Sequence, residues 1–136
     1  MNTLVIYYSF SGHTQAFAQK LALQEQADLL EIREAKKRSA LSAYLSGCLR
    51  AMGCKAVPIA DPQCDFDRYD RFIICCPIWE GFPAPAFHAV TALLPEQKRA
   101  ELYLLSASGE SRAKDKILQL LKNRNITDVT YTDVKA

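Results

Sequence analysis

Apolar runs bounded by turn residues recur along the chain with the length of β-strands, and helical patterns lie between them. The runs predict strands at residues 4–8, 29–32, 72–76, 102–107 and, with weaker alternation, 129–134. Apolar residues spaced three or four apart predict four helices, around 17–22, 41–52, 87–94 and 117–121. Strand and helix therefore alternate four times before a final strand.

Proline and serine residues mark the ends of two of these helices. Pro83 and Pro85 suit the start of the third helix, and Pro95 suits its end. Ser111 is a candidate N-cap for the fourth helix.

Strict alternation of strands and helices, with no repeat, linker or low-complexity segment, predicts one α/β domain over residues 1–136. Right-handed crossovers would join the strands into one parallel sheet. Residues 72–75 and 102–105 are apolar at every position, as strands covered by helices on both faces require.

Composition and charge do not indicate a particular function, but they disfavour some classes of protein. The 136 residues are 49% hydrophobic and 24% charged, with a net charge of +2, which is ordinary for a globular protein. The basic cluster at 33–38 contains Glu34 and no aromatic residue, which favours a solvated corner over nucleic-acid binding. We see no signal peptide or membrane span and expect a cytoplasmic protein.

The sequence lacks several common catalytic and metal-binding motifs. The chain lacks G-x-G-x-x-G, G-x-x-x-x-G-K-[ST] and G-x-S-x-G motifs and any zinc-type Cys spacing. Five cysteines without a secretory signal are read as free thiols, and Cys75 and Cys76 as small core residues. His13 is interpreted as a loop donor and His88 as a helix-surface residue, so no catalytic residue and no metal ligand is predicted.

Three loops should meet at one edge of the sheet. In an open parallel sheet, ligands bind beyond the carboxyl ends of the strands, which selects the loops 9–14, 77–85 and 106–111. The first loop precedes a helix, so its serines and threonine either cap that helix or help to cradle a phosphate, and the two readings are about equally good. Exposed Phe10 slightly favours a ligand. Trp79, the only tryptophan, either covers a flat ring system or folds back over the core.

At these loops the sequence resembles the flavodoxin family, and specifically small flavodoxin-like proteins with a P-x-W-x-G-x-x-x-P second loop. The resemblance rests on "VIYYSFSGHT", on "RYDRFIICCPIWEGFPAPA" and on "YLLSASGES", and it spans nearly the whole chain. It implies a doubly wound five-stranded parallel sheet of order 2-1-3-4-5 and the cofactor FMN. It also implies either electron transfer or a flavin-dependent, NAD(P)H- or quinone-linked oxidoreductase; a cofactor-free binding or regulatory module is the alternative.

Carried over position by position, the resemblance assigns three groups of cofactor-binding residues. The phosphate would be held by Ser9, Phe10, Ser11, Gly12, His13 and Thr14; the flavin ring would be flanked by Pro77, Ile78, Trp79, Glu80 and Gly81 and bordered by Ser106, Ala107, Ser108 and Gly109. In flavodoxins a peptide of the second loop reorients with the redox state of the flavin, and Glu80–Gly81 is the candidate here.

The sequence departs from that family in three ways. Cys75 and Cys76 stand where relatives often have Gly followed by Ser or Thr, so one hydroxyl contact is lost. The chain is slightly basic, which disfavours docking on a basic reductase. It ends at Ala136 without the usual C-terminal helix, which predicts exposed apolar area on one face of strands three to five and therefore a homodimer or a partner element there.

Overall fold

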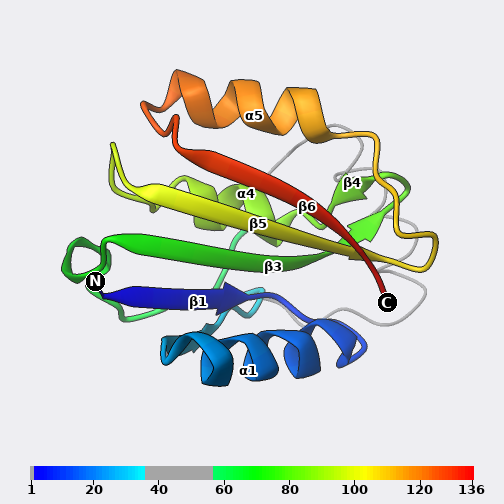
Figure 1. Ribbon diagram of the computed structural model, residues 1–136, viewed down its shortest axis with the longest axis horizontal. Helices are drawn as coiled ribbons and strands as arrows, with labels where there is room; N and C mark the ends of the chain where they lie inside the picture. The colour runs from blue at the N-terminus through cyan, green and yellow to red at the C-terminus, as the bar shows by residue number, and fades with distance from the viewer. Residues whose placement is uncertain (1, 36–56) are drawn as a thin grey trace.

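The computed structural model describes residues 2–35 and 57–136, and it shows a parallel sheet with helices on both faces (Figure 1). The strands are β1 Thr3–Tyr7, β2 Asp28–Glu31, β3 Arg71–Trp79, β4 Phe82–Pro83, β5 Arg99–Ser106 and β6 Val129–Lys135. The helices are α1 His13–Glu25, α4 Ala86–Thr91 and α5 Lys114–Asn123, with a 3₁₀ turn η2 at Phe66–Arg68. The helix predicted around 41–52 lies outside the described residues, as do Cys48 and Cys54.

The strand order confirms the predicted topology. The path is β2-β1-β3-β5-β6, with every neighbour parallel, which is 2-1-3-4-5 once the two-residue β4 is set aside. Strand β4 pairs only with β3, antiparallel, as the return of a hairpin. None of the described helices is long and apolar enough to cross a membrane.

Two apolar clusters form the core on the two faces of the sheet. The larger cluster joins Phe72 and Leu104 of the sheet to Phe87 of α4 and Ile117 of α5. The smaller cluster lies under α1 and contains Val5, Ile73, Cys75 and Leu105 of the sheet. The interpretation of Cys75 and Cys76 as small core residues agrees with this packing, since both side chains are buried.

Helix α4 begins beside Pro85, as predicted, but Pro83 lies outside it and its end differs from the prediction. Pro83 lies in β4, and Pro85 is the N-cap residue of a helix that ends at Thr91, well before Pro95. The helix has six residues, and Leu94 packs against the core from the turn that follows it.

The prediction that His88 is a helix-surface residue is wrong. Its side chain is 7% exposed, and Ala86, Phe87, Val90 and Thr91 are buried with it. His88 and Ile117 of α5 line the same cavity. The side of α4 that the pattern assigns to solvent thus carries a buried His88 and lines a cavity whose other wall is α5.

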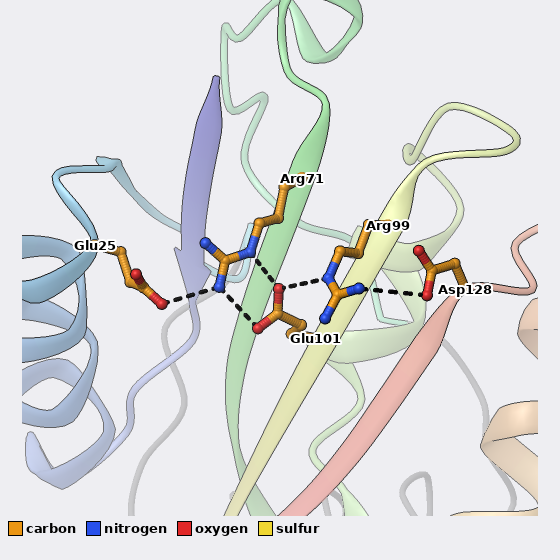
Figure 2. Close-up of polar contacts among 5 residues, drawn as sticks. All are labelled: Glu25, Arg71, Arg99, Glu101 and Asp128. Atoms are coloured by element: carbon orange, nitrogen blue, oxygen red, sulfur yellow. Dashed lines mark hydrogen bonds and ion pairs between the residues drawn. The ribbon is translucent and has the colours of Figure 1, made fainter. Parts of the chain in front are cut away.

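An ion-pair network occupies the α1 face of the sheet at the beginning of β3 and β5 (Figure 2). Arg71 donates through Nε and Nη2 to the Glu101 carboxylate, and its Nη2 lies 2.9 Å from Glu25 of α1. Arg99 lies 3.1 Å from the same Glu101 carboxylate and 3.6 Å from Asp128. Glu101 is the shared centre of this network and is only 7% exposed.

The expectation of exposed apolar area on this face is wrong for the described residues. The large apolar side chains that are exposed are Phe10, Leu23, Leu29 and Leu93, and none lies on β3, β5 or β6. On this face Glu101 and its register partner Thr130 are polar, whereas Tyr103, Leu105 and Val134 belong to or pack against the smaller core cluster and are buried or half-buried. The homodimer was predicted from this exposed apolar area. It stays a prediction, and the exposed area no longer supports it.

Glu101→Gln should lower the free energy of unfolding at pH 7 by about 2 kcal/mol, because two guanidinium groups lose the carboxylate between them. Hydrogen bonding from Arg71, and then from Arg99, holds the pKa of Glu101 below its usual range despite burial. A carboxyl group whose pKa is lowered in the folded state stabilises that state at pH values above its ordinary pKa, which is about 4.3 for Glu. The difference between variant and wild type should therefore shrink as the pH falls from about 4.3 through the lowered value.

Urea denaturation between pH 3 and pH 7 measures this difference. The control is Glu96→Gln, which removes a carboxylate from an exposed turn and should leave stability within about 0.5 kcal/mol. Equal stability of Glu101→Gln and wild type at pH 7 would contradict the role given to the network.

Candidate functional site

The loop between β1 and α1 leaves the helix N-terminus without a side-chain cap. Gly12 is the N-cap residue, with φ +99°, and no side chain bonds to the first turn. Ser9 Oγ instead accepts the Gly12 N–H at 3.0 Å, which organises the turn before the helix. No acidic residue lies in the first turn of the helix. Of the two interpretations of this loop, the structure does not support helix capping by a side chain. The backbone amides at the start of α1 can therefore receive an anion.

The side chains of this loop differ in exposure. Ser11 and His13 are exposed, while Thr14 is 3% exposed and packs beneath the helix start. A Cβ atom added at Gly12 would have no other atom within 4 Å. The loop therefore has open space beside Gly12, with Ser11 and His13 as its exposed polar side chains.

The second loop is a tight hairpin. Strand β3 runs to Trp79, which pairs with Phe82 across the two-residue turn Glu80–Gly81. Both turn residues have positive φ, 52° and 88°, as in the two-residue turns that match the twist of antiparallel strands. Glycine suits the second of these positions because it takes positive φ without strain.

Arg112 joins the third loop to this hairpin, and sequence reasoning missed it. Its Nη2 donates to Glu80 O at 2.7 Å, and its backbone N–H donates to Gly81 O at 2.7 Å. The guanidinium also lies 5.8 Å from the centre of the Phe82 ring. The only signal in the sequence is a basic residue directly after the third loop, which does not specify a partner 32 positions away.

Aromatic contacts join the first loop to the second. Trp79 meets Tyr8 at 6.2 Å and Phe10 at 6.1 Å between ring centres, both edge to face. Trp79 is half-buried and packs partly against the core, while Phe10 is 46% exposed. Trp79 thus rests on the core without being enclosed by it, and the expectation of an exposed Phe10 is confirmed.

A cavity of about 390 Å³ lies between the second and third loops. Of the predicted site residues, it is lined by Ile78, Glu80, Gly81, Ser106, Ala107 and Ser108, and it adds Glu110, Ser111 and Arg112. Pro77, Trp79 and Gly109 do not line it, nor do the residues of the first loop. The first loop reaches this region through the contact between Phe10 and Trp79.

Serine hydroxyls shape the third loop. Ser106 Oγ accepts the Gly109 N–H at 3.0 Å and donates to Glu110 O, while Ser108 Oγ accepts the Glu110 N–H. These bonds fold the loop back on the end of β5.

The prediction that Ser111 caps α5 is wrong. Helix α5 begins at Lys114, after Ala113, and has no side-chain cap. Ser111 Oγ lies 2.6 Å from Tyr131 Oη and donates to Asp133 Oδ1 at 2.7 Å, both on β6. Its hydroxyl is thus engaged across the sheet edge and cannot serve the helix.

The adjacent cysteines face the core. Burial raises the pKa of the Cys75 thiol to about 12, and Cys76 is 1% exposed with its Sγ 3.5 Å from Pro77 O. Cys76 lies in the larger core cluster and does not line the cavity. A hydroxyl at this position would therefore not reach the cavity without a change in the backbone.

The fold and the edge at which the loops meet define the class: a flavodoxin-like α/β fold. No family model and no curated protein matches the chain, but solved structures do. A flavoprotein of Lactobacillus acidophilus NCFM, crystallised in complex with FMN, is 21% identical with a TM-score of 0.70, covering 96% of this chain and 89% of that one.

Two further structures support the same fold. A protein of Bacteroides uniformis assigned as a flavoprotein is 20% identical with a TM-score of 0.79, covering 96% of this chain and 86% of that one. A flavodoxin of Streptococcus pneumoniae is 12% identical with a TM-score of 0.53, covering 100% of this chain and 87% of that one. At these identities the similarity is one of fold.

Proposed function

We propose that this protein binds FMN and works in a redox reaction. The observation that carries the proposal is the uncapped start of α1 beside a hairpin that presents Trp79. A helix N-terminus attracts phosphate through free amides and the helix dipole, and a half-exposed indole can cover a flat ring. The FMN bound to the Lactobacillus acidophilus flavoprotein supports the choice of ligand.

The donor set of the loops fits this cofactor. Amides of the α1 start, with Ser11 and His13 beside them, would receive the phosphate. Trp79, outside the cavity, and the cavity walls at Ile78, Glu80, Gly81 and 106–108 would enclose the ring. FMN supplies the electron or hydride chemistry, while the protein sets access and charge around it.

Titration with FMN, followed by the fluorescence of Trp79, tests the proposal directly, because the chain has one tryptophan. We expect saturable quenching by FMN and at least about tenfold weaker binding of riboflavin, which lacks the phosphate. No binding of FMN would favour a cofactor-free module. Equal binding of both ligands would contradict the phosphate cradle.

The redox role divides into electron carrier and oxidoreductase. Oxidation of NAD(P)H by the FMN-loaded protein with a quinone or dye acceptor would indicate an enzyme, and reduction without turnover would indicate a carrier.

The predicted homodimer is tested separately by sedimentation at micromolar concentration, where a monomeric mass would contradict it.

Glu80→Gln should raise the midpoint potential of bound FMN. Glu80 lines the cavity, and a carboxylate there disfavours the negative charge that a flavin gains on reduction. We expect a rise of roughly 30 mV, equivalent to about 1.4 kcal/mol for a two-electron couple. Potentiometric titration measures it, Glu96→Gln is the distant control, and an unchanged potential in Glu80→Gln would rule the effect out.

A further inference from the structure

Arg112 is the one cation among the described residues that line the cavity between the second and third loops. Two carboxylate residues, Glu80 and Glu110, line the same cavity. Carboxylates disfavour a ligand that carries or gains negative charge beside them, whereas a nearby cation favours it. Arg112 is therefore the charged residue of this wall that can stabilise negative charge on a ligand in the cavity.

The hairpin turn fixes the position of the Arg112 guanidinium. Its Nη2 donates to Glu80 O at 2.7 Å, and the backbone N–H of Arg112 donates to Gly81 O at 2.7 Å. A Cβ at Gly81 would lie 2.5 Å from Arg112 Nε, so the absence of a side chain at Gly81 makes room for the guanidinium. The charge is thus held against the turn by backbone groups.

The positive charge of Arg112 is not shared with a carboxylate. Arg112 forms no ion pair with any residue that the structure describes, and the group that accepts its Nη2 hydrogen bond is a neutral carbonyl. Arg71 and Arg99, by contrast, both pair with Glu101. Arg112 is exposed, so water screens its field, but a ring lying in the cavity would displace part of that water and strengthen the field at the ring.

We propose that Arg112 makes this site favour the reduced form of bound FMN, an inference that rests on the proposed function and on a flavin ring in this cavity. A flavin gains negative charge on reduction, and the Arg112 guanidinium stabilises that charge. The guanidinium stays protonated throughout the pH range in which the protein is folded. The oxidised ring is neutral and gains little from the same cation, so Arg112 acts on the choice between redox states and much less on affinity for oxidised FMN.

Potentiometric titration of the FMN-loaded protein at pH 7 tests this role. By linkage, the difference between the midpoint potentials of bound and free FMN gives the ratio of the dissociation constants of reduced and oxidised FMN. Arg112→Gln should raise that ratio about fivefold, which lowers the potential by roughly 20 mV for a two-electron couple. Arg112→Lys keeps the charge and should stay within about twofold of wild type. Arg124→Gln removes the same charge from an exposed residue that does not line this cavity, and it should leave the ratio unchanged.

Fluorescence titration of Trp79 with oxidised FMN separates this inference from the proposed function. Arg112→Gln should bind oxidised FMN within about threefold of wild type. Three outcomes would overturn the role of Arg112 while leaving FMN binding in place: an unchanged potential in Arg112→Gln; a potential of Arg112→Lys as low as that of Arg112→Gln, which would indicate a structural role; or a loss of FMN affinity of about tenfold or more without loss of riboflavin affinity, which would mean that Arg112 holds the phosphate. Absence of FMN binding by the wild type would overturn both the role of Arg112 and the proposed function.

Discussion

Ser11→Asp should weaken FMN binding by at least about 100-fold, which corresponds to about 2.7 kcal/mol. Ser11 is exposed in the loop before α1, where the proposed phosphate would meet uncapped amides. A carboxylate placed there repels the phosphate and competes for the same N–H groups. The same charge is favourable for the helix in the absence of ligand, so the free energy of unfolding should stay equal or rise slightly.

Fluorescence titration of the single tryptophan measures this change. Gln19→Asp is the matched control, since it adds the same charge at an exposed position further along α1 and should leave FMN binding within about threefold. Riboflavin binding should be nearly equal in all three proteins, because riboflavin has no phosphate to repel. FMN affinity of Ser11→Asp within about threefold of wild type would show that the phosphate binds elsewhere.

Gly81→Ala should lower the free energy of unfolding by about 3 kcal/mol. Gly81 has φ +88°, a conformation that costs other residues about 1–2 kcal/mol. A Cβ there would also lie 2.5 Å from Arg112 Nε and 3.3 Å from Arg112 Cβ. The Arg112 side chain cannot move aside without losing its Nη2 bond to Glu80 O, and its backbone is held by the N–H bond to Gly81 O. This adds about 1–3 kcal/mol.

Gly12→Ala separates the two contributions to that loss. Gly12 has φ +99°, but a Cβ there would meet nothing within 4 Å, so only the conformational cost of about 1–2 kcal/mol applies. Denaturant unfolding of both variants gives the difference, and a double-mutant cycle with Arg112→Ala isolates the steric part. Equal losses in Gly81→Ala and Gly12→Ala would contradict the close packing of Arg112 on the turn.

The sheet could be predicted from the sequence because its signals are local. Continuous apolar runs such as 72–75 occur where a strand is covered on both faces, and the handedness of crossovers then leaves few possible strand orders. The three loops at one edge follow from that order. The cavity confirms that the second and third loops converge, and the contact between Phe10 and Trp79 adds the first.

Predictions about the environments of single side chains were less successful. Ser111 is engaged by Asp133, 22 positions away, and so does not cap the nearby helix. His88 is buried although the sequence pattern places it on the surface of its helix, and it lines a cavity together with residues of α5. Arg112 finds its partner in a hairpin 32 positions earlier. Each outcome depends on a partner that local periodicity does not encode.

The sequence by itself determined the alternation of strands and helices and the three loops of the candidate site, because strand and helix periods and turn residues act over a few positions. The order 2-1-3-4-5 was implied by the resemblance to flavodoxins. Only the tertiary structure showed that no side chain caps α1, since that depends on whether a side chain reaches the first-turn amides. The anion site at Ser9–Thr14 stays a proposal. It also showed that the buried carboxylate of Glu101, with its two arginine partners, lies on the face of β5 where exposed apolar area was expected. Hydrogen bonds and burial join residues distant in sequence, and they exist only once the sheet has brought those residues together.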